Sequence, residues 1–209
     1  MFPAETLDRL IADELLAHCR CATIGRNIVV LEQTDSTNDA ILQVPSADSN
    51  EGLVLFAEHQ TAGRGQRGNR WESAAGKGLW FSILLQPNIK INASGRVTIW
   101  AIEAISDIIK REFSLEPAVK LPNDIQLYDR KVAGVLVEMR AQEKAPHLAI
   151  VGIGVNVNQS LEDFPSELQS RAISLAMALN RLVDRQKFAV ALLQHLDLTY
   201  RKRFTSAGL

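Results

Sequence analysis

A short loop of glycines and arginines is the segment of this sequence with the clearest chemical potential. Residues 63–71, GRGQRGNRW, hold three glycines, three arginines and a tryptophan in nine positions. Glycine tolerates positive φ and lets the backbone approach a ligand closely, and arginine presents forked donors to phosphate or carboxylate. A tryptophan face can cover an adenine ring. The composition therefore predicts a flap that closes over a phosphorylated ligand.

Two well-known phosphate-binding motifs fit this loop poorly. Its glycine spacing matches G-x-G-x-x-G, but the following residues, NRWES, do not start the helix that a dinucleotide fold requires. The spacing from Gly63 to Gly68 also fits a Walker A loop, but Asn69 stands where that motif has lysine. Taken alone, the loop is equally consistent with a solvated basic surface loop.

Three polar segments could complete a site around the loop. Residues 35–38, DSTN, link an expected strand to an expected helix, where backbone N–H groups are free. Asn123 and Asp124 offer an amide beside a carboxylate, which suits a ribose hydroxyl or a Mg²⁺-bound water, although an ordinary Pro-Asn-Asp turn explains them too. Lys131 begins a strand, a position at which lysine is usually only a solvated charge.

One expected strand carries two alternating glycines. Residues 152–158, GIGVNVN, would leave one sheet face bare, because side chains alternate between the two faces of a strand. A flat ligand could fill that face, and Asn156 and Asn158 would point to it from the strand end. Gly134 in the preceding strand likewise indicates a close approach to the backbone.

The elements that position these segments follow from hydrophobic periodicity and turn residues. Helices are expected at residues 4–20, 37–44, 94–113, 166–179 and 185–204, and strands at 27–33, 52–58, 79–86, 118–121, 125–128, 132–139 and 147–157. Ser36 and Asp39 have the spacing of a capping box, and Asp129-Arg130 is expected to form a tight turn. Several strands follow one another by hairpin, which predicts an α+β fold with a mixed, largely antiparallel sheet and flanking helices.

Composition narrows the function classes. The 209 residues suit one domain, and the net charge of -1 gives no basic field for nucleic acid or anionic lipid. Cys19 and Cys21 are expected to be ordinary thiols, since a disulfide framework would need more cysteines. The N-terminus has no basic signal-peptide region, and no apolar run is long enough to span a membrane. We therefore expect a cytoplasmic protein.

Taken in order, the segments resemble biotin–protein ligases, also called biotin–[acetyl-CoA-carboxylase] ligases. The resemblance is carried by DSTN at 35–38, Gln60 with the 63–71 loop, GLWFS at 78–82, KLPND at 120–124, RKVAG at 130–134 and GIGVN at 152–156. Each motif is weak alone, but the ordered set is specific. It implies a class II synthetase-like, biotin–lipoate ligase catalytic domain over residues 26–209, with a helical lead-in at 1–25.

The resemblance also implies an activity and its participants. Biotin would be activated by ATP and Mg²⁺ as biotinyl-5′-AMP and then transferred to a lysine of a biotin carboxyl carrier protein. Lys131 and Arg64 would be the catalytic residues. The biotin-binding residues would be Ser36, Thr37, Asn38, Gln60, Arg64, Gly65, Gln66, Lys131, Gly134 and Gly152. The nucleotide would contact Arg67, Arg70, Trp71, Asn123, Asp124 and Asn156, and Asp124 would serve Mg²⁺ indirectly.

The sequence departs from the family pattern at several points. Gln66 and Asn69 replace arginines that are usual in the loop, and Leu121 replaces the usual tryptophan before Pro-Asn-Asp. About thirty residues precede the DSTN motif, too few for the winged helix-turn-helix of some relatives, so no specific DNA binding is expected. The C-terminal SH3-like domain is expected to be absent or truncated, and a homodimer through a sheet edge is a family-based expectation. Lipoate–protein ligase, or a non-catalytic biotin- or nucleotide-binding protein, are the rival interpretations.

Overall fold

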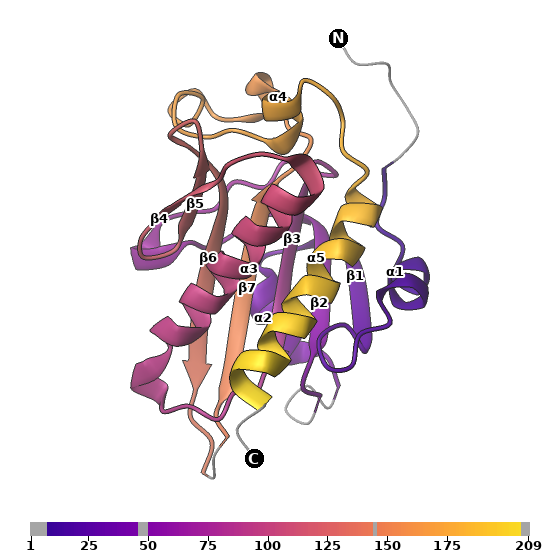
Figure 1. The fold of residues 1–209 in the computed structure, drawn as a ribbon, viewed down its shortest axis with the longest axis vertical. Helices are drawn as coiled ribbons and strands as arrows, with labels where there is room; N and C mark the ends of the chain where they lie inside the picture. The colour runs from indigo at the N-terminus through magenta and orange to yellow at the C-terminus, as the bar shows by residue number, and fades with distance from the viewer. Residues whose placement is uncertain (1–7, 46–49, 144–145, 206–209) are drawn as a thin grey trace.

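A single seven-stranded sheet organises the molecule (Figure 1). The computed structural model describes residues 8–45, 50–143 and 146–205. The strands are β1 (Asn27–Thr34), β2 (Leu53–Gln60), β3 (Gly78–Leu85), β4 (Ala118–Lys120), β5 (Asp124–Leu127), β6 (Arg130–Arg140) and β7 (Leu148–Asn156), in the order β1-β2-β3-β7-β6-β5-β4. Among these seven strands, β1 and β2 are the one pair that runs parallel. The mixed, largely antiparallel sheet predicted from the hairpin pattern is confirmed.

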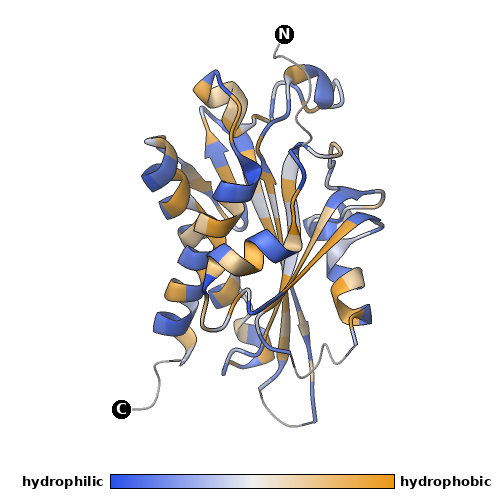
Figure 2. Cartoon of the chain, turned by 90° about the vertical axis from the view of Figure 1, so that its right-hand side faces the viewer, coloured by the Kyte–Doolittle hydropathy of each residue, from blue (hydrophilic) through white to orange (hydrophobic). Residues whose placement is uncertain are grey.

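Helices cover the two sheet faces unequally. The long helices α3 (Gly95–Phe113) and α5 (Arg185–Tyr200) pack on one face, and α1 (Ala12–Cys19) lies beside α5. The short α2 (Thr37–Ala40), continued by a 3₁₀ turn at Ile41–Gln43, contacts β2, β3 and β7. Seen from the side, apolar residues run along the strands and on the helix faces turned to them (Figure 2). The face that carries α2 is therefore the weakly covered one.

The alternation of side chains along β3 explains two separate cores. Phe81 and Ile83 belong to the large cluster under α3 and α5, whereas Leu84 joins a smaller cluster with Ile41 and Leu55 on the α2 face. All eight residues of β3 are buried, because both of its faces are covered. The continuous apolar pattern at 79–86 therefore marks a central strand of the sheet.

Two predicted helices begin well after their expected starts. At the N-terminus the helix begins at Ala12 rather than residue 4, because Leu10 N and Ile11 N donate to the side chains of Glu58 and Gln186 instead of entering a helix. Residues 1–7 lie outside the described part. Near the C-terminus only α4 (Leu175–Leu179) is helical within 166–179. The residues just before it hydrogen-bond to the backbone of Lys131 through Arg171 O and Ile173 N.

Three local expectations are also wrong. Ser36 is the N-cap of α2 but makes no side-chain cap, because Asp39 is turned to Arg64 rather than back to the helix start. The tight turn lies at Tyr128 and Asp129, both with positive φ, one residue earlier than expected. Cys19 and Cys21 form a disulfide instead of free thiols. The chain reverses in a left-handed conformation at Arg20, which brings the two cysteine Cα atoms to 5.3 Å.

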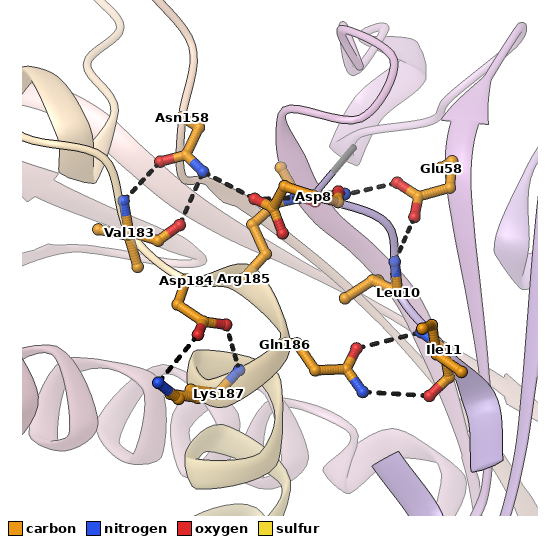
Figure 3. Close-up of polar contacts among 11 residues, drawn as sticks. Asp8, Leu10, Ile11, Glu58, Asn158, Val183, Asp184, Arg185, Gln186 and Lys187 are labelled. Carbon is orange, nitrogen blue, oxygen red and sulfur yellow. Dashed lines mark hydrogen bonds and ion pairs between the residues drawn. The ribbon is translucent and has the colours of Figure 1, made fainter. Parts of the chain in front are cut away.

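A buried arginine joins the N-terminal segment, the sheet and α5 (Figure 3). Arg185, at the first turn of α5, is fully buried, and its guanidinium donates to Asp8, to Glu58 Oε2 at 2.8 Å and to Gly78 O at 2.9 Å. Glu58 lies near the end of β2 and Gly78 begins β3. The arginine therefore anchors both strands where the loop between them leaves and returns.

Among the described residues, no helix is long and apolar enough to cross a membrane.

Candidate active site

Two neighbouring cavities lie on the weakly covered face, and two side chains separate them. The smaller cavity, about 40 Å³, lies between α2, β6, β7 and the 63–71 loop. The larger, about 410 Å³, lies between the loop, the β4–β5 hairpin and the segment before α4. Trp71 and Lys131 line both cavities. The lysine therefore stands at the boundary between a small space and a wide one.

Hydrogen-bonding side chains form one end of the small cavity. Gln60 Oε1 accepts from Thr37 N at 2.9 Å and from Thr37 Oγ1 at 3.1 Å. Asn38 Oδ1 accepts from Ser82 Oγ at 2.6 Å, and Asn38 Nδ2 donates to Glu138 Oε2 at 2.6 Å. Ser36, Thr37 and Asn38 are all buried. These groups form a rigid set of donors and acceptors, suited to a small polar ring with N–H and C=O groups.

The bare sheet face predicted from the glycines exists, but the protein's own side chains occupy it. Gly134 and Gly154 face each other across β6 and β7. A Cβ at Gly154 would lie 2.5 Å from Trp71 Cε2, and one at Gly134 would lie 2.9 Å from Trp71 Cζ3. The indole thus rests on the two glycines, and its Nε1 is buried with no hydrogen-bond partner among the described residues. Asn38 fills the space above Gly152 in the same way.

The 63–71 loop is an ordered hairpin in this structure. Trp71 N donates to Gly63 O at 2.9 Å, Gly65 N donates to Asn69 O at 2.7 Å, and a 3₁₀ turn spans Gln66–Gly68. Arg64 reaches across the small cavity to two carboxylates, Asp39 Oδ1 at 2.9 Å and Glu138 Oε2 at 3.0 Å. The loop thereby covers the small cavity with a cation at its rim.

The larger cavity mixes cations with carboxylates. Its lining comprises Asn69, Arg70, Trp71, Glu72, Lys120, Asp124, Gln126, Asp129, Lys131, Asn156, Phe164, Leu168, Arg171 and Ala172. Lys131 Nζ lies 2.6 Å from Asp124 Oδ1 and 5.0 Å from the Trp71 ring centroid. Cation–π and ion-pair contacts together fix the ammonium group at the boundary of the two cavities.

Most of the residues expected to bind ligand are gathered here. The small cavity is lined by Ser36, Thr37, Asn38, Gln60, Arg64, Gly65, Trp71, Asn123, Lys131, Gly134 and Gly152, and the large one by Arg70, Trp71, Asp124, Lys131 and Asn156. Gln66 and Arg67 line neither cavity, and their ligand contacts stay predictions. Asn156 donates its amide to Lys131 O and Ile173 O, so it connects β6 and the segment before α4 to the end of β7.

Sequence reasoning missed several charged residues of the site, among them Glu138 and Arg171. Glu138 binds Asn38 and Arg64 from the far half of β6, and nothing in the local sequence separates it from an ordinary exposed strand residue. Arg171 lines the large cavity from a segment that was expected to be helical. Its signal would have been a basic residue in a stretch rich in turn formers, PSELQSR at 165–171.

The metal chemistry of the site is limited. Among the described residues, no group of three or more histidine, cysteine, aspartate or glutamate side chains is placed to hold a metal ion. The large cavity does hold the carboxylates of Glu72, Asp124 and Asp129. Such oxygens suit Mg²⁺, which proteins commonly bind through one or two carboxylates together with substrate phosphates.

The sequence model of the biotin/lipoate A/B protein ligase family matches residues 30–156, which include every segment of the two cavities except the stretch before α4. The chain belongs to the biotin/lipoate A/B protein ligase family. The bifunctional ligase/repressor BirA of Bacillus spizizenii is 32% identical over 94% of the chain, and the biotin–[acetyl-CoA-carboxylase] ligase of Mycobacterium tuberculosis is 31% identical over 91%.

Solved structures of this ligase family share the fold. The biotin protein ligase of Aquifex aeolicus, solved in complex with biotin and ATP, superposes with a TM-score of 0.74 at 28% identity, covering 87% of this chain and 73% of that one. The chain spans 59% of the length of the Bacillus relative and 69% of the mycobacterial one. The biotin/lipoate ligase catalytic fold inferred from the motifs is thus confirmed.

Proposed function

We propose that this chain is an ATP-dependent biotin–protein ligase. It activates biotin as biotinyl-5′-AMP and transfers the biotinyl group to a lysine of a biotin carboxyl carrier protein. The observation that carries the proposal is the position of Lys131 in the wall between two cavities of different character. One cavity has the hydrogen-bonding groups for a small polar ring, and the other has the volume and charge for a nucleotide.

The ureido ring of biotin binds beside Ser36, Thr37, Asn38 and Gln60. Thr37 and Asn38 are already fixed by Gln60 and Ser82, so ordering the protein costs little on binding. The small cavity, about 40 Å³, has room for only a few waters in this conformation. Trp71 therefore leaves the shelf of Gly134 and Gly154 when the acid enters, and the ring system of biotin takes that place.

The first step joins the acid to the nucleotide. A carboxylate oxygen of biotin attacks the α-phosphorus of ATP, an O–P bond forms, and pyrophosphate leaves with the electron pair of the broken bond. Two anions meet in this step, and charge grows on the phosphoryl oxygens. The ammonium of Lys131, released from Asp124, stabilises that charge at the cavity boundary, and Arg64 supplies a second cation from the loop.

The second step transfers the acyl group. The amine of a carrier lysine attacks the biotinyl carbonyl carbon, an amide bond forms, AMP leaves and one proton is released. The closed loop keeps water from the mixed anhydride until the carrier arrives. Asp124 and Asp129 are the carboxylates that would hold the water ligands of a Mg²⁺ ion, and such an ion would supply positive charge beside the nucleotide phosphates.

The same proposal includes a cytoplasmic location, no specific DNA binding, and a homodimer formed through an exposed sheet edge. Strand β4 offers such an edge, since all three of its residues are exposed. An analytical ultracentrifugation run with and without biotin and ATP measures the oligomeric state directly.

Biotin-dependent exchange of labelled pyrophosphate into ATP tests the adenylation step. Lipoate and octanoate serve as comparison acids, and Lys131→Ala as the active-site control. We expect exchange with biotin alone and a loss of at least about a hundredfold in the variant, the scale for removing a charge-stabilising group. Exchange that requires lipoate would assign the chain to the other branch of the family. Biotin binding without exchange would make it a binding protein.

A further inference from the structure

Glu138 joins the loop to the floor of the small cavity. Its Oε2 atom accepts from Asn38 Nδ2 at 2.6 Å and lies 3.0 Å from an Arg64 guanidinium nitrogen. Asn38 is buried beneath the cavity, whereas Arg64 comes from the loop that covers it. One carboxylate oxygen thus binds a residue from each side of the ligand space.

The sheet register explains why this position alone can make both contacts. On β6, residues 134, 136 and 138 face the same side, because side chains alternate along a strand. Gly134 pairs with Gly154, Leu136 with Gly152, and Glu138 with Ile150. The glycines clear space for the ligand, and the glutamate stands two residues beyond that space, below α2. Glu138 therefore touches the cavity residues without lining the cavity itself.

The contact to Asn38 decides how its amide is turned. The Nδ2 group donates to Glu138, and Oδ1 accepts from Ser82. An ionised glutamate at 138 can only accept, so an amide rotated by half a turn would lose its bond to Glu138 and place two oxygens against each other. The donor and acceptor that Asn38 presents to a ligand are thereby fixed.

The contact to Arg64 holds the loop closed. Asp39 contributes a second carboxylate to the same guanidinium, and all three side chains are partly exposed, at 41%, 58% and 37% for Arg64, Asp39 and Glu138. Each exposed pair alone stabilises the closed loop weakly. Glu138 differs from Asp39 because its other partner is a buried amide that restricts its own movement.

We propose that Glu138 is a positioning residue for the ligase reaction, which sets the acid affinity through Asn38 and the closure of the 63–71 loop through Arg64. Because it touches neither reacting group, its loss changes biotin binding and loop opening more than the use of ATP. The reaction part of this inference rests on the proposed function, but the closure of the loop can be measured without any reaction.

Limited trypsin digestion of the unliganded protein tests the loop, which contains three arginines with exposed side chains. We expect Glu138→Ala to be cleaved within residues 64–70 about five to ten times faster than the parent, as a charge-assisted bond to the loop is lost. Glu138→Gln should be cleaved faster as well. Glu103→Gln on α3, which breaks a comparably exposed pair with Arg203 beyond α5, is the matched control and should not change loop cleavage.

Calorimetric biotin binding and the exchange assay test the second contact. Glu138→Ala should weaken biotin binding by about tenfold, the cost of one hydrogen bond to a charged group, with KM for ATP within about twofold of the parent. Glu138→Gln keeps an acceptor for Asn38 and should rescue most of the biotin affinity while the loop stays more cleavable. Thermal unfolding of each variant separates this pattern from a general loss of stability.

Unchanged loop cleavage and unchanged biotin affinity in Glu138→Ala would overturn the inference. Equal losses for biotin and ATP, accompanied by a lowered Tm, would overturn it too, because they would make Glu138 merely structural. A parent protein that binds biotin but exchanges no pyrophosphate would contradict the proposed function. The loop-cleavage and biotin-binding measurements would still test the role of Glu138.

Discussion

At the scale of single residues, the glycines of the site determine where the neighbouring side chains can lie. Gly152 is the sharpest case, because a Cβ there would overlap Asn38 Oδ1 and lie 3.1 Å from its Cγ. Asn38 cannot move back easily, since Ser82 and Glu138 hold both ends of its amide. Because Gly152 has no Cβ, Asn38, a residue that would bind the acid, can occupy this position.

Gly152→Ala should accordingly weaken biotin binding by about tenfold or more, because overpacking a filled site costs about 1–3 kcal/mol. Titration calorimetry with biotin measures this directly. Gly95→Ala is the control, since a Cβ at that position meets nothing within 4 Å. Equal affinities in parent and Gly152→Ala would show that Asn38 is not a ligand contact.

Gln66 yields a second prediction at this scale. It stands where arginine is usual in the family, and it lies at the turn of the loop, outside both cavities. We expect the parent to release activated biotin more readily than Gln66→Arg does, because an arginine would add a cation near the adenylate phosphate. Labelling of free amines by released adenylate reports the difference, and no decrease in Gln66→Arg would contradict it.

Some of these residues could be predicted from the sequence, and others could not. The loop, Lys131 and the paired glycines were found because their residue types are unusual for their positions in strands and turns. Glu138, Arg171 and Arg185 were not, because each is an ordinary charged residue until the fold brings it to a partner more than thirty positions away. Trp71 was expected to cover an adenine, and its place on the glycine shelf could not be inferred without the register of β6 and β7.

At the scale of elements, the position of the loop depends on the anchoring of β2 and β3. Arg185 bonds to Glu58 on one strand and to Gly78 O on the next, while Gly76 N donates to Glu58 O. The loop therefore leaves and returns at fixed points. Movement of the loop is then confined to the residues between them, and the strands that carry Gln60 and Ser82 stay in place.

Removal of this anchor should destabilise the protein strongly. Arg185→Met leaves the carboxylate of Glu58 buried without its cation, and we expect a loss of about 3–5 kcal/mol in the free energy of unfolding. Chemical denaturation measures it. Combining Arg185→Met with Glu58→Gln should recover part of the loss, because the unpaired charge is then removed. A loss below about 1 kcal/mol would mean that the pair behaves like a surface contact.

Element boundaries were predicted best where periodicity alone decides them. Helix α3 begins within one residue of the expected start and ends at the expected residue, since its apolar stripe packs on the sheet. The boundaries failed where side chains compete for the backbone, as Glu58 does for Leu10 N. The predicted boundary also failed before α4. The backbone of that segment, which has helical periodicity, hydrogen-bonds instead to Lys131 at the start of β6.

At the scale of the whole molecule, stability should depend on pH through His195 on α5. Burial, and next the guanidinium of Arg111, lower the pKa of His195 from its ordinary value of 6.5, while Asp107 raises it and Lys202 lowers it further. The unfolded chain thus binds a proton more readily than the folded one. The stabilising contribution is complete above about pH 6.5 and is lost as the pH falls through the folded-state pKa.

Chemical denaturation at a series of pH values between 7.5 and 5 checks this expectation. The free energy of unfolding should decline more steeply on acidification in the parent than in His195→Gln, which has no proton to bind at that position. Parallel curves for the two proteins would show that His195 titrates alike in the folded and unfolded chains.

The wall shared by the two cavities has a thermodynamic consequence. Trp71 and Lys131 belong to both, so whatever moves them to admit the acid also reshapes the space open to the nucleotide. Linkage then requires that the factor by which one ligand alters the affinity of the other be the same in both directions. Besides the contact at their reacting atoms, the two ligands would sense each other's occupancy through this wall, and the molecule would be cooperative within a single chain.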